Sequence, residues 1–397
     1  MPAFTFEAAR RCVLDTVRSA HGAPQIENVA LEAAAGRVLA EPIAADRDYP
    51  ALARSVRDGY AVRAADLPGE LQVIGEVRAG ESFGGEVGAR QTVEIMTGAP
   101  VPRGADAVVM LEHVLREGGR MIAGQGAAVG QFINPQASEA RAGQILLNAG
   151  KRLDYTDIAM LAAAGKHRVP VYAAPQVAII ATGDEIVPLA ATPRDFQIRN
   201  SNVYSLAAQV TRAGGVPEIL PVARDEMGHT RELIDRGLEA DILLLSGGVS
   251  AGKYDIVERV LEGLGAEFFF DRVLIQPGQP LVFGKAHGKF FFGLPGNPSS
   301  TMVTFEIFAR AALEVLGGQQ EIEMHMPFAR LTEDFHHRVG LTRFLPARLS
   351  LDGAEVTPIA WRGSSDVPAL TRANAFLVVD ADRPAWQAGD WIRVLLK

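Results

Sequence analysis

The sequence predicts a multidomain protein in which a doubly wound α/β unit is combined with smaller β units. Its 397 residues exceed the roughly 250 to 300 at which a single core stops growing. Apolar strands alternate with helices between residues 175 and 264, which is typical of a parallel sheet covered on both faces. Short strands punctuated by glycine and proline fill the stretches on either side, as they do in small β units.

The first 45 residues carry a helical pattern. Residues 4–20 place their apolar side chains on one face of a helix. A second, shorter helix is expected over residues 31–39, since Pro42 then interrupts the pattern. Cys12, the only cysteine, lies on the apolar face of the first helix. We therefore expect a packed core thiol there and not a nucleophile.

A β domain is predicted over residues 46–140, where glycine and proline become frequent and the strands are short. Residues 71–77 are one such strand. After residue 140 the helical signals return, and Asp154 is a suitable N-cap for the next helix. The simplest arrangement is a β domain inserted into a helical domain made of residues 1–45 and 141–173.

The α/β unit is predicted over residues 174–319. The expected strands are 177–181, 216–222 and 242–245, and the expected helices are 202–213, 229–238 and 256–264. In such sheets ligands bind outside the carboxyl ends of the strands. The loops at that edge are therefore the first place to look for a site.

The remaining residues, 320–397, return to short strands. A hairpin is expected over residues 349–356, with its turn at Asp352-Gly353. Two further strands complete the chain. A small β barrel and a β sandwich fit this pattern equally well.

Charge and composition restrict the class of function. The formal net charge is -8 and no run of Lys or Arg occurs, so we expect neither nucleic acid nor a membrane surface as a partner. No apolar run approaches the roughly 18 residues of a membrane helix. The first residues also lack the pattern of a signal peptide. We therefore expect a cytoplasmic protein that acts on small molecules.

Five loops at the expected carboxyl edge are rich in glycine and carboxylates. They are 182–185 (TGDE), 224–225 (RD), 246–248 (SGG), 276–280 (QPGQP) and 294–298 (LPGNP). Glycines let a ligand approach the backbone, and amides at a helix N-terminus favour anions. Neighbouring carboxylates repel one another unless a cation lies between them, and magnesium is usually held by one or two carboxylates plus substrate oxygens. The loops together predict a site for a phosphate-like anion and magnesium, although each alone also fits an ordinary turn.

The stretch 246–255, SGGVSAGKYD, differs by one residue from a nucleotide-binding P-loop. Tyr254 stands where that loop has the hydroxyl that holds magnesium, and no separate Walker-B strand is evident. We therefore expect an anion loop lined by backbone amides and not a triphosphate site.

Six motifs are spread over almost the whole chain: RDGYAVR (57–63), IMTGAPVP (95–102), TGDE (182–185), SGGVS (246–250), GLPGNP (293–298) and RAN (372–374). In this order they resemble the motifs of the molybdopterin molybdenumtransferase family, the bacterial MoeA type, to which the C-terminal domain of gephyrin is related. The resemblance implies an extended helical domain, an inserted β domain, an α/β molybdopterin-binding domain and a C-terminal β barrel. It also implies an elongated homodimer with the site in a cleft between subunits.

The resemblance further implies a reaction. Members take adenylylated molybdopterin, hydrolyse its adenylate with a divalent metal such as Mg²⁺, and ligate molybdate to the dithiolene while AMP leaves. The molybdopterin adenylyltransferase and molybdoenzymes are the implied protein partners. Tungstate stays open beside molybdate, because the two oxyanions have nearly the same size and charge.

The matching motifs also imply site residues. The implied catalytic carboxylates are Glu185, Asp58, Asp225 and Asp255. The implied metal ligands are Glu185, Asp225 and Glu139, the last lying near the position of a Gly-Glu-Asp segment in the family. The implied substrate-binding residues are Thr97, Thr182, Gly183, Ser246, Gly247, Gly248, Ser250, Gln276, Gly278, Gln279, Pro295, Gly296, Asn297 and Ser364.

Some positions depart from the family pattern. Gln276 and Gln279 stand where lysines are common, and Pro346 stands where an arginine is common. Each lost charge-assisted contact is worth about 1.5 to 3 kcal/mol, so weaker binding of molybdate or pterin is expected. Two alternatives stay open: a non-catalytic molybdopterin-binding carrier or scaffold, and another enzyme on the same α/β domain, such as a nucleotide-derivative hydrolase of the competence-damage type. Intact Glu185 opposes the first, and the two β domains oppose the second.

Overall fold

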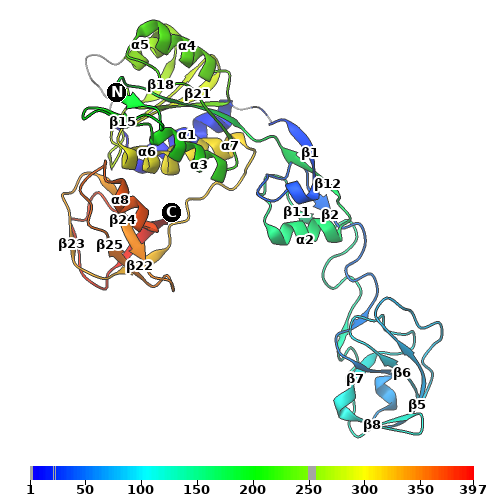
Figure 1. The fold of residues 1–397 in the computed structure, drawn as a ribbon. Helices are drawn as coiled ribbons and strands as arrows, with labels where there is room; N and C mark the ends of the chain where they lie inside the picture. The colour runs from blue at the N-terminus through cyan, green and yellow to red at the C-terminus, as the bar shows by residue number, and fades with distance from the viewer. Residues whose placement is uncertain (1–2, 21, 23, 249–255) are drawn as a thin grey trace. The chain divides into compact units, whose positions relative to one another are not determined.

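The computed structural model describes residues 3–20, 22, 24–248 and 256–397 (Figure 1). Contacts within the chain divide it into two compact units. The larger unit comprises residues 1–40, 150–153 and 169–397, and the smaller one comprises residues 41–149 and 154–168. Each unit has hydrophobic cores of its own.

A six-stranded sheet forms the centre of the larger unit. Its order is β16 (Val216–Ile219), β13 (Gln176–Ala181), β17 (Ile242–Ser246), β21 (Lys289–Leu294), β20 (Val282–Ala286) and β18 (Glu267–Phe270). The first four strands run parallel, which confirms the parallel pairing predicted from the uniformly apolar strands. β20 is antiparallel to both of its neighbours, so the sheet is mixed at that side.

Helices cover both faces of this sheet (Figure 1). One core contains Val177 and Ile179, and the other contains Ala178 and Ile180, as alternating side chains of one strand require. The helices in the first core are α1 (Phe6–Ala20), α3 (Asn202–Arg212), α6 (Pro298–Thr304) and α7 (Arg310–Leu316). Those in the second are α4 (Met227–Gly237) and α5 (Ile256–Gly263). The doubly wound α/β domain is therefore confirmed.

The C-terminal region is a closed five-stranded barrel. Its strands are β24 (Thr342–Leu349), β25 (Glu355–Pro358), β22 (Phe328–Leu331), β28 (Trp391–Leu396) and β26 (Ala375–Val379). β26 pairs back onto β24 and closes the ring, which decides between barrel and sandwich. The hairpin of β24 and β25 is confirmed, and its turn residue Gly353 has φ +73°.

The smaller unit contains a second six-stranded sheet. Its order is β7 (Ala107–Met110), β4 (Gly59–Val62), β6 (Gln91–Ile95), β5 (Gly69–Val77), β9 (Arg120–Ala123) and β8 (Val114–Glu117). The same unit contains α2 (Tyr155–Ala163), and Asp154 accepts hydrogen bonds from the Thr156 and Asp157 N–H groups. The predicted N-cap is thus confirmed. In the same unit, β2 (Ile43–Ala44) pairs antiparallel with β11 (Ile145–Leu147).

The helix predicted over residues 31–39 is wrong in extent. Only a single 3-10 turn forms, Leu31–Ala33. Gly36 then has φ +77°, and Leu39 pairs with Val171 across an antiparallel bridge. So short a helix is marginal alone, and backbone pairing buries the apolar Leu39 instead. The domain limits at residues 45 and 141 stay a prediction. α1, which the prediction places in the helical domain, packs in the core on one face of the α/β sheet.

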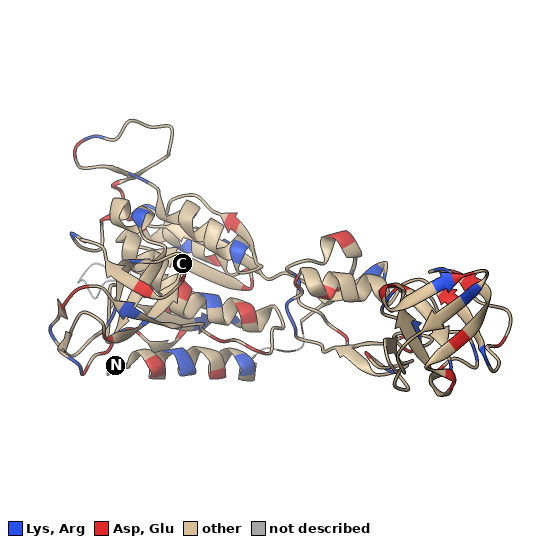
Figure 2. Cartoon of the chain, turned by 90° about the horizontal axis from the view of Figure 1, so that it is seen from below, with Lys and Arg blue, Asp and Glu red and all other residues tan. Residues whose placement is uncertain are grey.

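Charged residues are distributed over both units. Lys and Arg residues are interspersed with Asp and Glu residues along the helices and strands (Figure 2). None of the described helices combines the length and the apolar character that crossing a bilayer requires.

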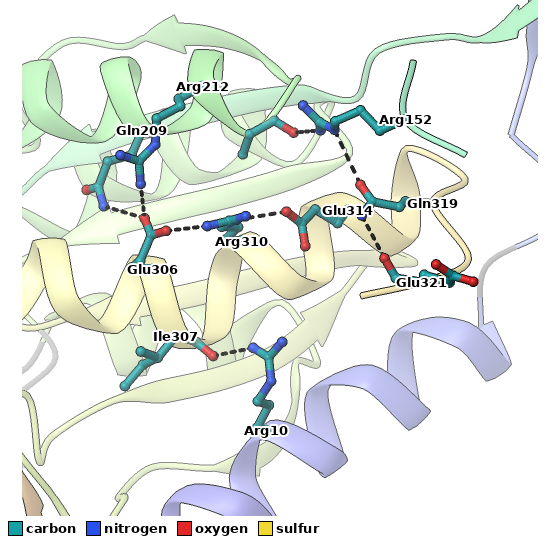
Figure 3. A network of polar contacts seen from close by, with 11 residues as sticks. Arg10, Arg152, Gln209, Arg212, Glu306, Ile307, Arg310, Glu314, Gln319 and Glu321 are labelled. Atoms are coloured by element: carbon teal, nitrogen blue, oxygen red, sulfur yellow. Dashed lines mark hydrogen bonds and ion pairs between the residues drawn. The ribbon is translucent and has the colours of Figure 1, made fainter. Parts of the chain in front are cut away.

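A network of charged side chains joins α3 to the helical segment that runs from α6 through residues 305–309 into α7 (Figure 3). The Glu306 side chain is only 5% exposed and accepts hydrogen bonds from Arg310 and, at 2.8 Å, from Arg212 Nη2. Arg310 Nε also donates to Glu314 Oε1 at 2.7 Å. Arg10 of α1 donates to the Ile307 carbonyl at 2.8 Å beside this network. The buried carboxylates are therefore matched by cations, as buried charges must be.

Candidate functional site

A cavity of about 410 Å³ opens at the carboxyl ends of β13, β17 and β21. This is the edge where the alternating α/β pattern predicts a ligand. The cavity brings together eight of the predicted site residues, and they come from three loops that are far apart in the sequence. These are Thr182, Glu185, Ser246, Gly247, Gly248, Pro295, Gly296 and Asn297.

The loop after β13 contributes the carboxylate of the cavity. Gly183 has φ +132°, and a Cβ at this position would collide with the Glu185 carboxyl group. Only glycine combines this backbone conformation with so close an approach. The Asp225 N–H donates to Asp184 Oδ1 at 3.3 Å, so the exposed Asp225 lies beside the Glu185 loop without lining the cavity.

The loop after β17 packs directly on the loop after β13. Gly247 and Gly248 have φ +92° and +63°, and a Cβ on Gly248 would lie 2.6 Å from Thr182 Oγ1. The Thr182 side chain is buried, and its hydroxyl has no hydrogen-bond partner among the described residues. Ser250 and Asp255, both predicted for this loop, lie outside the described residues.

The loop after β21 begins α6 at the cavity wall. Pro298 occupies the first turn of α6, where its missing N–H costs nothing. The Ser299 N–H donates to the Ser364 carbonyl at 2.9 Å, which brings Ser364 beside the predicted loop. The predicted residue Gly278 has φ +100°, and a Cβ there would collide with Thr304 of α6. Gly278 and Ser364 therefore lie against α6 and are not among the described residues that line the cavity.

The two glutamines predicted to bind substrate have other neighbours. Gln276 belongs to β19 (Ile275–Gln276), which pairs with β24 of the barrel in register with Arg343. With its amide oxygen facing the Arg272 guanidinium, Gln279 accepts from Arg272 Nη2 at 3.1 Å. Neither glutamine is among the described residues that line the cavity, although Pro280 at the end of their loop is. Burial lowers the pKa of Arg343.

The cavity is also lined by a second group of residues, which were not predicted from the sequence. Arg199 ends β15 (Ile198–Arg199), which pairs with β14 (Ile186–Val187) directly after Glu185. Its Nε donates to the Leu189 and Ala191 carbonyls at 3.1 Å each. Asn202 begins α3 and donates into the cavity loops. The run Asn200-Ser201-Asn202 at the start of a helix was the available signal, since polar helix starts gather at this edge of the sheet.

The smaller unit brings two further predicted residues together. Asp58 Oδ1 accepts hydrogen bonds from the Thr97 N–H at 2.6 Å and from Thr97 Oγ1 at 2.8 Å. These two bonds lower the pKa of the Asp58 carboxyl, the backbone bond most strongly. Glu139 of the same unit instead accepts from Asn134 Nδ2 at 2.9 Å.

The carboxylates at the cavity bear on whether a metal could be held there. The described residues include no cluster of three or more His, Cys, Asp or Glu side chains able to hold a metal. Glu185 is the one carboxylate among the described residues lining the cavity, and Asp225 lies on the neighbouring loop. This donor set fits magnesium, which takes one or two carboxylates and completes its shell with substrate oxygens and water.

Consecutive stretches of the chain match three family descriptions. They are the MoeA N-terminal region (domain I and II) over residues 4–165, a probable molybdopterin binding domain over 178–315, and the MoeA C-terminal region (domain IV) over 329–397. The molybdopterin molybdenumtransferase of Bacillus subtilis (strain 168) is 35% identical over 386 residues, which cover 94% of this chain and 90% of that protein. This chain belongs to the MoeA family. The molybdopterin molybdenumtransferase of Staphylococcus aureus (strain Mu50) is 32% identical, and the match covers 93% and 90% of the two chains.

Solved structures agree with this assignment. The crystal structure of the molybdopterin biosynthesis moeA protein from Pyrococcus horikoshii OT3 has a TM-score of 0.85 at 29% identity, with all of both chains covered. A second such structure, from Pyrococcus horikosii, has a TM-score of 0.77 at 32% identity and covers 100% of this chain and 99% of that one. Both the resemblance and the fold class predicted from the sequence are confirmed. As a MoeA family member the chain is a transferase of molybdenum cofactor biosynthesis.

Proposed function

We propose that this MoeA family member inserts molybdenum into molybdopterin, by hydrolysing adenylylated molybdopterin, releasing AMP and ligating molybdate to the dithiolene. The observation that carries the proposal is the cavity, where Glu185 and the glycine loops meet at one edge of the sheet. The names of the relatives supply the chemical class of the substrate. Backbone amides and the start of α6 favour the phosphate of such a ligand.

The cavity residues divide the chemistry between them. The N–H group of Gly248 is proposed to stabilise charge that develops on the phosphate, as preorganised donors do. Glu185 and Asp225 would hold Mg²⁺ together with phosphate oxygens. A metal held by these residues would supply polarisation of the phosphate. Thr182, Ser246 and the Pro295–Asn297 loop would hold and orient the substrate.

Residues of the smaller unit complete the proposal. Asp58, which the Thr97 bonds keep ionised, would supply a further carboxylate, and Glu139 a further metal ligand. Asp255 is proposed as a further catalytic carboxylate, and Ser250 is proposed as a substrate contact. We propose a cytoplasmic homodimer that receives its substrate from the molybdopterin adenylyltransferase and delivers the cofactor to molybdoenzymes. Gly278, Ser364, Gln276 and Gln279 are proposed as further substrate contacts.

The decisive assay follows AMP release from adenylylated molybdopterin with Mg²⁺, with and without molybdate, and activation of a cofactor-free molybdoenzyme. We expect molybdate-dependent AMP release and an activated enzyme. Glu185→Ala should abolish AMP release at an unchanged circular dichroism spectrum and melting temperature. Retained turnover in this variant would remove Glu185 from the mechanism.

The same assay tests the carrier hypothesis, which the neutral Gln276 and Gln279 favour. A carrier or scaffold would bind the pterin tightly without releasing AMP. A chain that binds no pterin would share the MoeA fold without this function.

A further inference from the structure

Asn202 joins two loops of the cavity. Its Nδ2 donates to Ser246 Oγ, after β17, at 2.9 Å and to the Gly296 carbonyl, after β21, at 2.8 Å. A carbonyl only accepts hydrogen bonds, so Nδ2 and not Oδ1 must face Gly296. The orientation of the amide is thereby fixed.

This amide does not serve the helix that carries it. Ser201 is the residue before α3, and it makes no side-chain cap hydrogen bond. Asn202 also leaves its own Oδ1 buried without a partner among the described residues. Both donor bonds of the side chain go to the cavity loops instead, where Ser246 and Gly296 line the wall.

Among the residues that the structure describes, one backbone hydrogen bond also joins the two loops. The Gly247 N–H donates to the Leu294 carbonyl at 3.1 Å, and that bond lies at the root of the loops. A Cβ on Gly296 would lie 3.5 Å from Gly247 Cα, so the two glycine backbones face each other closely. The Asn202 amide adds a side-chain tie between these loops beyond their root, at Ser246 and Gly296 of the cavity wall.

We propose that Asn202 is a positioning residue that sets the spacing of the β17 and β21 loops and thereby the affinity of the cavity for its ligand. The identity of the ligand rests on the proposed function, whereas the effect on loop spacing does not. Small shifts in such spacing matter, because a misplacement of bound substrate by about 1 Å can lower the reaction rate a hundredfold.

The chain offers a matched control on the same helix. Gln209 Nε2 donates to the Met302 carbonyl at 3.0 Å, and its Oε1 is also buried without a partner among the described residues (Figure 3). It differs from Asn202 in facing the charged network and not the cavity. Gln209→Ala therefore removes a comparable amide without touching the cavity loops.

The first experiment measures hydrogen exchange in the free protein. Asn202→Ala should raise the exchange rates of the amides of residues 246–248, 296 and 297 at least fivefold, and Gln209→Ala should leave them unchanged within twofold. Asn202→Asp, which keeps the shape but has no N–H donor, should behave like Asn202→Ala. Equal exchange in the wild type and both Asn202 variants would overturn the proposal whatever the ligand is.

The second experiment measures the dissociation constant of molybdopterin for the same proteins. We expect a rise of at least tenfold for both Asn202 variants and less than twofold for Gln209→Ala, at similar melting temperatures for the two alanine variants. If the wild type binds and Asn202→Ala binds equally well, the positioning role is wrong and the proposed function stands. If the wild type binds no molybdopterin, the proposed function fails, and the exchange data alone decide whether Asn202 spaces the loops.

Discussion

The two ends of α3 reach two polar regions of the larger unit, and these regions treat buried charge and polarity differently. Near the C-terminal end, Arg212 joins a network in which the buried Glu306 and Glu314 are matched by arginines. At the N-terminal end, Asn202 Oδ1 and Thr182 Oγ1 are buried without partners among the described residues. An unpaired buried polar group costs about 1 to 3 kcal/mol. The buried carboxylates of the network thus have charged partners, although Gln209 Oε1 beside them has none among the described residues, whereas the cavity keeps polar atoms without partners at a cost to stability, as sites for ligands do.

The largest effect on stability is expected in the network. Glu306→Ala leaves Arg212 and Arg310 without their shared carboxylate, and removing one partner of a buried pair costs roughly 3 to 5 kcal/mol. The two arginines are 51% and 38% exposed and Arg310 keeps Glu314, so we expect a smaller loss, about 1.5 to 3 kcal/mol for the lost bonds to charged groups. Urea unfolding of the larger unit measures this value, and molybdopterin binding should be retained.

A surface pair is the control for this prediction. Glu218 and Arg236 are both more than half exposed, so Glu218→Ala should cost under about 1 kcal/mol. Equal losses for Glu306→Ala and Glu218→Ala would show that the network does not stabilise the fold.

At the cavity, Gly183→Ala should impair function more than stability. The new Cβ both strains the backbone at φ +132° and displaces the Glu185 carboxylate. Strain of this kind costs about 1 to 3 kcal/mol, and we expect AMP release to fall by more than tenfold. The assay is AMP release at saturating substrate, combined with the melting temperature.

Gly288→Ala separates strain from displacement. Gly288 has φ +80° in the β20–β21 turn, at the opposite edge of the sheet, with nothing within 4 Å of a Cβ. It should lose similar stability and keep its AMP release. A parallel loss of activity in both variants would contradict the proposed role of Gly183.

A smaller effect of opposite sign is expected at Thr182. Thr182→Val removes a hydroxyl without a described partner, so stability should stay level or rise by up to about 1 kcal/mol. Thr301→Val, by contrast, removes a hydroxyl that donates to the Pro295 and Asn297 carbonyls, and should cost about 1 kcal/mol. Melting curves give both values. A loss at Thr182 as large as that at Thr301 would mean that its hydroxyl is satisfied in the free protein.

The smallest effect concerns Asp58 in the smaller unit. Thr97→Val removes the hydroxyl bond but keeps the stronger N–H bond, so the pKa of Asp58 should rise part of the way to its ordinary value. A lowered carboxyl pKa stabilises the fold above the unfolded value and loses that contribution as pH falls through the folded value. The variant should therefore lose less stability on acidification.

Carboxyl NMR titration measures this shift directly. Asp46, whose pKa is lowered by the Tyr49 hydroxyl bond, is the internal reference and should not change. An unchanged pKa at Asp58 would show that the hydroxyl of Thr97 bonds elsewhere in solution.

The sequence predicted what depends on local pattern. Uniformly apolar strands such as 177–181 identified the central sheet, and the glycine loops at their ends identified most of the cavity. Arg199 and Asn202 were missed because their place depends on the pairing of β14 with β15 across a ten-residue excursion (188–197), which no local pattern encodes. The same holds for Gln276, since its strand pairs with β24 of the barrel more than 60 residues later.

The chain leaves and re-enters the larger unit at one small ladder. The Leu39 N–H donates to the Lys151 carbonyl at 2.9 Å, the Gly150 N–H donates to the Leu39 carbonyl at 2.7 Å, and Leu39 also pairs with Val171. Adjacent ends are what allow one domain to be inserted into another without disturbing the host fold. For protein engineering, the smaller unit is thus removable as two segments, 41–149 and 154–168. A glycine-containing turn from Ala40 to Gly150 and a second linker from Leu153 to Val169 would close the larger unit, and the α/β domain and barrel could be produced without the inserted sheet.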